Sequence, residues 1–410
     1  MKAATTIPKL RFSDFTQKWT ILRMENIGRV IRGASPRPKG DKRYYGGTVP
    51  RLMVQDVTRD GKWVTPTIDS LTEAGAKLSR PCPAGTLTIV CSGTVGIVSF
   101  LAVDACIHDG FLALIDIDET AVTKDFLFHR LSTLREQFEQ GATHGGIFTN
   151  LTTSGIKEFE FPAPTLPEQR KIADFLTAVD GWIGQLIQKK ALLEDYKKGV
   201  MQQLFTQAIR FKDEHGNDFP EWEEKKLGEA TKWASGGTPS KDNASFWEGD
   251  IPWLSAASMH ERYYSDSPLR VSKEGVKSGS KMALKGTLLL LVRGSMLWNR
   301  IPVGITTRDV AFNQDVKALT PTGKVLAGFL LQWFIASENM LLHKVVGTGI
   351  GAGKLDTDEM KSLRFRLPTT EEQTKIADFL SALDRKIESV ATQITETQTF
   401  KRGLLQQMFV

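Results

Sequence analysis

Apolar residues recur at every seventh position in two stretches of the chain, and this spacing predicts two long helices. The seam positions in the first stretch are Ile172, Val179, Leu186, Leu193 and Val200. Those in the second stretch are Ile376, Leu383, Val390 and Leu404, with Thr397 in the same series. A second apolar row follows four residues after the first, and sustained heptads of this kind are typical of a coiled-coil seam. Each helix would be roughly 55 Å long at 1.5 Å per residue.

The two predicted helices are copies of one another. Residues Glu168–Leu176 return as Glu372–Leu380, 204 positions later, with one difference in nine. Such agreement without a gap indicates an internal duplication, which has to be recognised before the fold is assigned. Thr165 with Glu168, and Thr369 with Glu372, have the spacing of a capping box, so we expect both helices to begin there.

The duplication extends into the segments before the helices. Arg11, Phe12 and Trp19 match Arg210, Phe211 and Trp222, and further Gly- and Pro-containing motifs follow in the same order. We therefore expect an α+β fold in which two similar mixed α/β domains are each followed by a long helix. The predicted segments are 1–165 and 207–368 for the domains, and 166–206 and 369–410 for the helices.

Local patterns predict some elements inside the domains. Buried strands are expected at Leu87–Cys91 and Thr287–Val292, and helices near Lys124–Glu139 and Val325–Val345. The order of the strands stays open at this point.

Composition changes this picture little. The chain of 410 residues is 41% apolar and 24% charged, with a formal net charge of +6, which permits nucleic-acid binding without requiring it. Its three cysteines have neither zinc-site spacing nor disulfide density, which favours a reducing cytoplasm. The first residues lack the apolar run of a signal peptide, and no apolar stretch is long enough to span a bilayer, so no membrane association is expected.

Catalytic motifs are not found in the sequence. The Gly-rich run Gly347–Gly353 lacks the Lys-Ser/Thr ending of a phosphate-binding loop, and the six histidines show no metal-site spacing. A nuclease triad of Asp218, Glu223 and Lys225 has no match in the first copy. We expect no catalytic residues, no metal and no cofactor in this chain.

Residues suited to DNA contact concentrate in Gly- and Pro-rich loops. The segment Arg29–Arg43 holds six basic residues and one acidic residue and is followed by two tyrosines, a composition suited to phosphate and base-edge contact. A solvated surface loop is the plain alternative. The candidate DNA-binding residues of the first half are Arg32, Ser35, Arg37, Lys39, Lys42, Arg43, Tyr44, Tyr45, Ser92, Thr94 and His144. Those of the second half are Thr238, Ser240, Lys241, Asn243, Arg293, Ser295, Trp298, Asn299, Arg300 and Lys354.

These motifs together resemble a known family. The run from Pro167 through Leu176, with the ending Gln203-Leu204-Phe205, is similar to the central conserved region of type I restriction-modification specificity subunits. Its copy at Glu372–Phe409 resembles their C-terminal conserved region, and Phe219–Trp222 resembles their usual entry to a target recognition domain. The resemblance covers essentially the whole chain.

The resemblance implies a function without catalysis. In that family each recognition domain reads one half of a split site in double-stranded DNA, and two antiparallel helices fix the spacing with approximate two-fold symmetry. Two modification subunits, which use S-adenosylmethionine to methylate adenine N6, dock on the specificity subunit. Restriction subunits translocate and cut DNA with ATP and Mg. A stand-alone DNA methyltransferase or nuclease, or a coiled-coil adaptor that binds proteins, remains the alternative.

Overall fold

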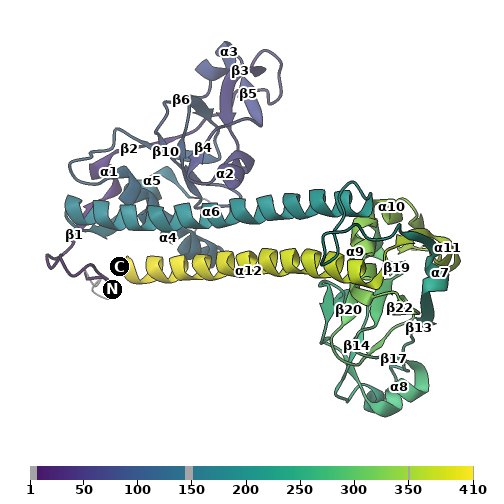
Figure 1. Cartoon of the computed structure of the whole chain (residues 1–410). Coiled ribbons are helices and arrows are strands. Elements are labelled where there is room, and N and C mark those ends of the chain that lie inside the picture. Colours follow the sequence, from purple (N-terminus) through teal and green to yellow (C-terminus); the bar gives the residue numbers. More distant parts are fainter. Residues whose placement is uncertain (1–6, 144–150, 350, 410) are drawn as a thin grey trace. The chain divides into compact units, whose positions relative to one another are not determined.

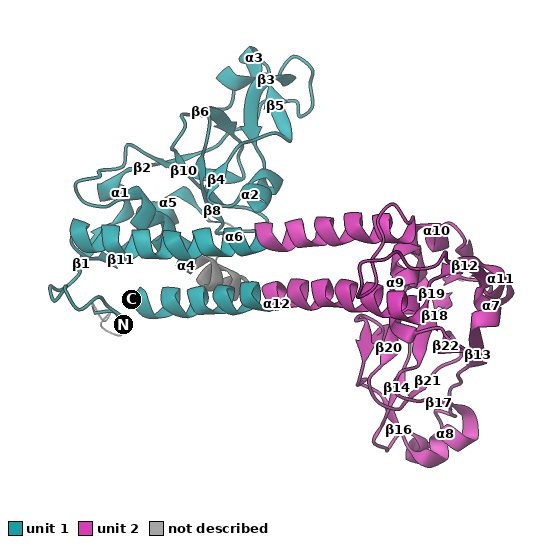
Figure 2. Ribbon diagram, in the orientation of Figure 1, with its two compact units in different colours: residues 1–187, 392–410 teal, residues 188–391 magenta. Residues whose placement is uncertain are grey.

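The computed structural model describes residues 7–143, 151–349 and 351–409 (Figure 1). The chain divides into two compact units, coloured separately in Figure 2. Unit 1 comprises residues 1–187 and 392–410, and unit 2 comprises residues 188–391. Each unit therefore contains one domain together with part of each long helix.

Unit 1 is built on two main sheets. The five-stranded sheet has the order β2 (Arg29–Arg32), β10 (Phe111–Ile115), β7 (Leu87–Val90), β8 (Val98–Leu101), β4 (Trp63–Val64). The four-stranded sheet has the order β5 (Asp69–Leu71), β3 (Tyr45–Leu52), β9 (Ala105–Ile107), β6 (Arg80–Cys82). A separate pair joins β1 (Thr20–Arg23) to β11 (Glu160–Ala163). The central strands β7 and β8 are buried at every position, and their two polar residues, Thr88 and Ser99, form a hydrogen bond with each other at 2.8 Å.

Unit 2 repeats this strand order. Its five-stranded sheet runs β13 (Thr231–Ser235), β22 (Val316–Pro321), β18 (Leu288–Leu291), β20 (Val303–Thr306), β15 (Tyr263–Tyr264). Its four-stranded sheet runs β16 (Arg270–Val271), β14 (Ile251–Leu254), β21 (Val310–Phe312), β17 (Lys281–Ala283). The separate pair is β12 (Glu223–Lys226) with β25 (Arg364–Leu367). Unit 2 also has a three-stranded sheet of β19 (Arg293–Gly294), β24 (Gly353–Lys354) and β23 (Val346–Gly347).

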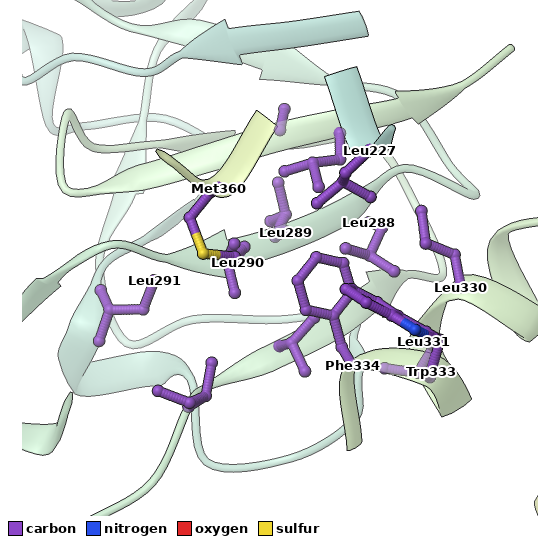
Figure 3. Close-up of a cluster of buried hydrophobic side chains, with 14 of the residues drawn as sticks. Leu227, Leu288, Leu289, Leu290, Leu291, Leu330, Leu331, Trp333, Phe334 and Met360 are labelled. Atoms are coloured by element: carbon purple, nitrogen blue, oxygen red, sulfur yellow. The ribbon is translucent and has the colours of Figure 1, made fainter. Parts of the chain in front are cut away.

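Short helices cover these sheets. In unit 1 they are α1 (Met24–Ile27), α2 (Val54–Asp60), α3 (Glu73–Lys77), α4 (Lys124–Thr143) and α5 (Thr153–Lys157). In unit 2 they are α7 (Leu227–Ala230), α8 (Lys273–Gly279), α9 (Ala327–Ala336), α10 (Glu338–Leu342) and α11 (Thr357–Ser362), with 3₁₀ turns at Ala244–Phe246, Ala256–Ser258 and Ser295–Trp298. Figure 3 shows Leu288–Leu291 of β18 and Phe334 of α9 in the core of unit 2. The predicted strands and helices are thus confirmed, with Val325–Val345 split into α9 and α10.

The two long helices are α6 (Leu166–Phe205) and α12 (Thr370–Met408). In unit 1 the first turns of α6 share a core with Leu404 and Met408 of α12. In unit 2 Leu204, near the end of α6, shares a core with Ile376 and Leu380 at the start of α12. The helices therefore run antiparallel, and the predicted fold class is confirmed.

Matched ion pairs join the helices within each unit. In unit 1 Lys401 of α12 lies 2.5 Å from Asp180 of α6. In unit 2 Lys197 of α6 lies 2.5 Å from Asp384 of α12. Asp384 is the copy of Asp180 and Lys401 is the copy of Lys197, so each helix supplies the acid in one unit and the base in the other. The same contact between the helices therefore occurs in both units, with the roles of α6 and α12 exchanged.

Burial along the predicted seam varies. Six of the nine seam residues are buried: Ile172, Val179, Leu186, Ile376, Val390 and Leu404. The other three are half-buried: Leu193, Val200 and Leu383. In unit 1 the apolar residues at the start of α6 also pack on the domain core, so the buried residues serve more than helix pairing.

Each long helix begins directly after the predicted threonine, and Glu372 N donates to Thr369 Oγ1 at 3.4 Å, but the glutamate carboxylates bind other partners than those of a capping box. The carboxylate of Glu168 is 1% exposed and accepts from Arg11 Nε at 2.7 Å and from Trp19 Nε1 at 3.4 Å. Glu372 likewise accepts from Arg210 and from Trp222 Nε1 at 2.9 Å. Guanidinium donors from the preceding segment thus hold both carboxylates, because a charged partner forms a stronger hydrogen bond than a backbone amide.

The glutamine that follows each glutamate ties the helix to its domain. Gln169 Nε2 donates to the carbonyls of Ala121 and Pro164, and its Oε1 accepts from Thr123 N at 2.8 Å. The same three bonds recur in the second copy, where Gln373 contacts Lys324, Pro368 and Leu326. Both side chains are buried with their polar atoms paired, which explains why these residues are shared by the two copies.

Candidate nucleic-acid interface

The loop between β2 and β3 in unit 1 begins at Gly33, where its backbone lies in close contact with the backbone of His108. A Cβ on Gly33 would lie 2.0 Å from the carbonyl oxygen of His108, so only glycine fits there. In unit 2 a Cβ on Gly236 would lie 2.2 Å from the carbonyl oxygen of Phe312. Each glycine thus allows its loop to pack closely on the end of a strand, β9 in unit 1 and β21 in unit 2.

A hydrogen-bond relay fixes this loop in unit 1. Arg51 on β3 is 5% exposed, and its guanidinium forms an ion pair with Asp69 and donates to Ser35 Oγ at 2.9 Å. Since arginine only donates, the Ser35 hydroxyl directs its proton to Asp109 Oδ1, 2.5 Å away. This bond is the main cause that holds the pKa of Asp109 below its usual range. Asp109 is therefore an exposed carboxylate that only accepts hydrogen bonds.

A basic hollow of about 390 Å³ adjoins the relay. It is lined by Arg32, Ser35, Arg37, Lys39, Arg51, Met53, Ser92, His108, Asp109 and Gly110. Four cations against one carboxylate give it a positive potential, which favours a phosphate or another anionic group.

His108 lines this hollow with a neutral ring, whose Nε2 is itself buried without a hydrogen-bond partner among the described residues. Its Nδ1 accepts from Gly110 N at 2.9 Å, so the neutral ring carries its proton on Nε2. Burial lowers the pKa of His108, with Arg51 adding to the effect, so the ring is uncharged at neutral pH.

The other predicted residues of unit 1 lie on or beside this loop. Arg37, Lys39 and Lys42 are exposed, with the Arg37 guanidinium 3.8 Å from Asp109. Arg43 pairs with Asp41 at 2.7 Å and covers the Tyr44 ring. Tyr45 donates to the carbonyl of Pro36, Arg32 donates to the carbonyl of Asp109, and Thr94 is exposed. His144 lies outside the described residues. Contact of these residues with DNA stays a prediction.

The matching loop of unit 2 has the same framework with different chemistry. Thr238 Oγ1 donates to Gln314 Oε1 at 2.7 Å, as Ser35 does to Asp109. Trp253 stands in the place of Arg51 and donates to the carbonyl of Gly237 at 3.2 Å. Ser240, Lys241 and Asn243 are exposed, and Asn243 caps the turn that follows by accepting from Ser245 N. The loop is polar and carries less positive charge than its counterpart.

The second predicted cluster of unit 2 lies on the three-stranded sheet. Arg293 of β19 pairs in register with Lys354 of β24, and both side chains are exposed. Trp298 is 49% exposed and is fixed by a bond from its Nε1 to the carbonyl of Gly351 at 3.0 Å. Ser295 and Asn299 are exposed as well. Two exposed cations thus lie on this small sheet, and the exposed ring of Trp298 lies in the 3₁₀ turn that directly follows β19.

Arg300 differs from these exposed residues because its guanidinium binds backbone carbonyls of the same domain. Its guanidinium donates to the carbonyls of Met259 at 2.7 Å and His260 at 3.2 Å. These bonds attach Arg300 to the segment around Met259 and His260, and its predicted contact with DNA stays a prediction.

The candidate DNA-binding residues predicted from the sequence do not include Arg51, His108, Asp109 or Gln314. The strand registers decide how these residues correspond between the two copies. Leu52 pairs with Ile107 in unit 1, and Leu254 pairs with Phe312 in unit 2, so His108 corresponds to Asn313 and Asp109 to Gln314. A shift of one residue exchanges the two faces of a strand, so it changes which side chains are compared. The sequence did contain one indication of this set of residues, because the two copies have chemically different residues, Arg51 and Trp253, at the same position.

Metal sites and membrane-spanning helices are two other features that bear on function. Among residues 7–143, 151–349 and 351–409, no group of three or more His, Cys, Asp or Glu side chains is placed to hold a metal ion. In the same part of the chain, no helix is both long and apolar enough to cross a membrane.

Comparison with known proteins gives consistent matches. A family model described as the type I restriction modification DNA specificity domain matches residues 16–194 and 220–398. The EcoR124I/EcoR124II specificity subunit of Escherichia coli is 26% identical over 67% of this chain and 66% of its own length. The MjaIX specificity subunit of Methanocaldococcus jannaschii is 26% identical over 58% of this chain and 57% of its own length. The matched regions thus span about two thirds or less of these relatives.

Solved structures show the same fold. The S subunit of a type I restriction-modification system from M. genitalium aligns with a TM-score of 0.58 at 16% identity, over 98% of this chain and 99% of that chain. A structure concerned with complex assembly and conformational transition of the type I R-M system aligns with a TM-score of 0.60 at 17% identity, over 94% and 96% of the two chains.

Proposed function

Because this chain belongs to the type I restriction-modification DNA specificity family, as a non-catalytic DNA-recognition subunit, we propose that each of its two domains binds one half of a split double-stranded DNA site. The observation that carries this proposal is the repeated sheet framework with unlike loops. Both units have the same strand order, yet Arg51, Ser35 and Asp109 in one correspond to Trp253, Thr238 and Gln314 in the other. A common scaffold with different polar groups is what two readers of different half-sites need.

The long helices supply the second part of the proposal. They have 40 and 39 residues, so each is about 60 Å long at 1.5 Å per residue. We propose that their antiparallel pairing sets the unread gap between the half-sites. The boundaries at 165, 206 and 368 between domains and helices stay predictions.

Partner subunits are the third part. Large apolar side chains are exposed along the helices, among them Trp182, Leu192, Tyr196 and Phe400. Exposed aromatic residues are enriched at protein interfaces. We propose that two modification subunits, which carry S-adenosylmethionine, dock on such helix faces. Restriction subunits with ATP and Mg would join that complex in the cytoplasm, where the cellular DNA is.

The test is genome-wide adenine methylation, measured by long-read sequencing in cells that express this chain with and without a cognate modification subunit. We expect a split methylated motif only when both are present. Methylation by the chain alone would instead favour a stand-alone methyltransferase. An absence of methylation with a partner that methylates through another specificity subunit would favour a protein-binding adaptor.

A further inference from the structure

One exposed side chain occupies the same place in both units and differs in chemistry. Asp109 follows β9 by two residues, and Gln314 follows β21 by two residues. Each accepts a hydrogen bond from the hydroxyl two residues after the loop glycine, at 2.5 Å from Ser35 and 2.7 Å from Thr238. These contacts join sites 74 and 76 residues apart in sequence, so they are features of the fold rather than of local chain geometry.

The surrounding backbone is matched as well. In unit 1 Gly110 N donates to His108 Nδ1 at 2.9 Å, and in unit 2 Asp315 N donates to Asn313 Oδ1 at 3.1 Å. Each turn then continues into the antiparallel strand β10 or β22. Asp109 and Gln314 are therefore presented by the same turn, and both are exposed.

The hydroxyl partner determines which atoms remain for a ligand. In unit 1 Ser35 occupies Asp109 Oδ1, and Arg37 approaches Oδ2 only to 3.8 Å, so Oδ2 is left to accept a hydrogen bond. In unit 2 Thr238 donates to Gln314 Oε1, which leaves the amide NH₂ of this exposed side chain to donate and Oε1 a second lone pair. One position thus offers an acceptor only, and the other offers a donor beside an acceptor.

These two patterns correspond to different bases in the major groove. A carboxylate accepts from the N4 amino group of cytosine, whereas glutamine forms paired bonds with N6 and N7 of adenine. We propose that Asp109 and Gln314 are specificity-determining residues of the two domains: Asp109 selects a base that presents an amino group, with cytosine preferred, and Gln314 selects adenine. This inference rests on the proposed function, since it assigns the base-reading position within each recognition domain.

The basic hollow beside Asp109 supports this assignment. A carboxylate among Arg32, Arg37, Lys39 and Arg51 would be unfavourable for phosphate binding by itself, but the cations can hold the backbone while the carboxylate faces a base edge. In unit 2 Lys241 is exposed on the loop that carries Thr238, and it can hold the backbone in the same manner.

Exchange of the reading groups tests the inference. Asp109→Gln and Gln314→Glu would be assembled with the modification subunits and assayed for methylation on duplexes with randomised half-sites. We expect each variant to change the preferred base at one position of one half-site, by roughly 5- to 150-fold, and to leave the other half-site unchanged. Glu119→Gln is the matched control, because Glu119 is an exposed acid of unit 1 paired with Lys124 and lies outside the loop.

Asp109→Asn covers the case in which Asp109→Gln fails to fold. It keeps the size of the side chain and an acceptor for Ser35, and we expect it to relax discrimination at the same single position. A wild-type complex that yields no split motif would overturn the proposed function. A wild-type split motif that Asp109→Asn, Asp109→Gln and Gln314→Glu all leave unchanged, or weaken equally for every base, would overturn this inference alone.

Discussion

His129 is a single residue whose titration should be visible in the stability of unit 1. It is fully buried on α4, with Nε2 3.2 Å from Thr177 Oγ1 of α6. Burial lowers its pKa to about 3, and the positive charges of Lys401 and Lys62 add to this, against a smaller opposite effect of Asp125. The folded state therefore binds fewer protons at this ring than the unfolded state does below the ordinary histidine pKa.

We expect unit 1 to lose stability as the pH falls from about 6.5 toward 3, since the unfolded chain takes up the proton first. His129→Gln should flatten this part of the pH profile, because Gln332 fills the matching position of α9 in unit 2 and does not titrate. Urea unfolding at a series of pH values measures the effect, with exposed His215→Gln as the control. Equal pH slopes for wild type and His129→Gln would contradict the assignment.

For single residues, the sequence shows which side chains are polar or charged but not which residues they form hydrogen bonds with. Ser35 and Thr238 were predicted as DNA-binding residues, and the structure shows both in matched hydrogen bonds within the protein that the sequence did not indicate. Arg300 was predicted to bind DNA as well, and its guanidinium also donates to two carbonyls about 40 residues away in sequence. Residue type and local spacing carry no information on such distant acceptors.

The start of each long helix depends on one buried carboxylate. Glu372→Ala should destabilise unit 2 by about 3 kcal/mol, the lower end for breaking a buried ion pair, because Arg210 is 21% exposed. Its neighbour Glu371 is exposed in the same helical turn, so Glu371→Ala should change stability by about 0.5 kcal/mol or less. Chemical denaturation of the two variants gives this comparison, and equal losses would show that Glu372 acts only through the first turn of the helix.

Elements with long, regular patterns were predicted well. The heptads of α6 and α12 and the apolar runs of β7 and β18 extend over enough residues to be distinctive. The sheet of β19, β24 and β23 was not predicted, because each of its strands has two residues and β19 joins β24 across about 60 residues of chain. The helix starts at Thr165 and Thr369 were predicted correctly, but the partners of Glu168 and Glu372 were not, since Arg11 and Arg210 lie far from these glutamates in sequence.

At the scale of the whole molecule, a change in the length of a long helix tests whether the helices set the gap between the half-sites. Insertion of four residues after Lys190 should lengthen α6 by about 6 Å. We expect the gap in the methylated motif to grow while both half-sites stay the same, because no domain residue is altered. The motif is measured by long-read sequencing with the modification subunit present, and Lys189→Ala with Lys190→Ala serves as the control without insertion. An unchanged gap would contradict the role of the helices in spacing.

The duplicated organisation of the molecule could be predicted from the sequence, but its division into units could not. The repeat predicts a boundary after each helix, whereas contacts place residues 392–410 with the first domain. That grouping depends on which helix ends pack together, as when Phe409 meets Phe126 at 5.4 Å between ring centroids.

The discontinuous composition of unit 1 has a consequence for synthesis on the ribosome. Residues 188–391 are translated between its two parts, which at 5–20 residues per second takes on the order of ten to forty seconds. During that time Phe126 and the start of α6 lack Leu404, Met408 and Phe409, which complete their core. The domain made first is therefore the one finished last, and a nascent chain exposes this apolar surface until its final helix emerges.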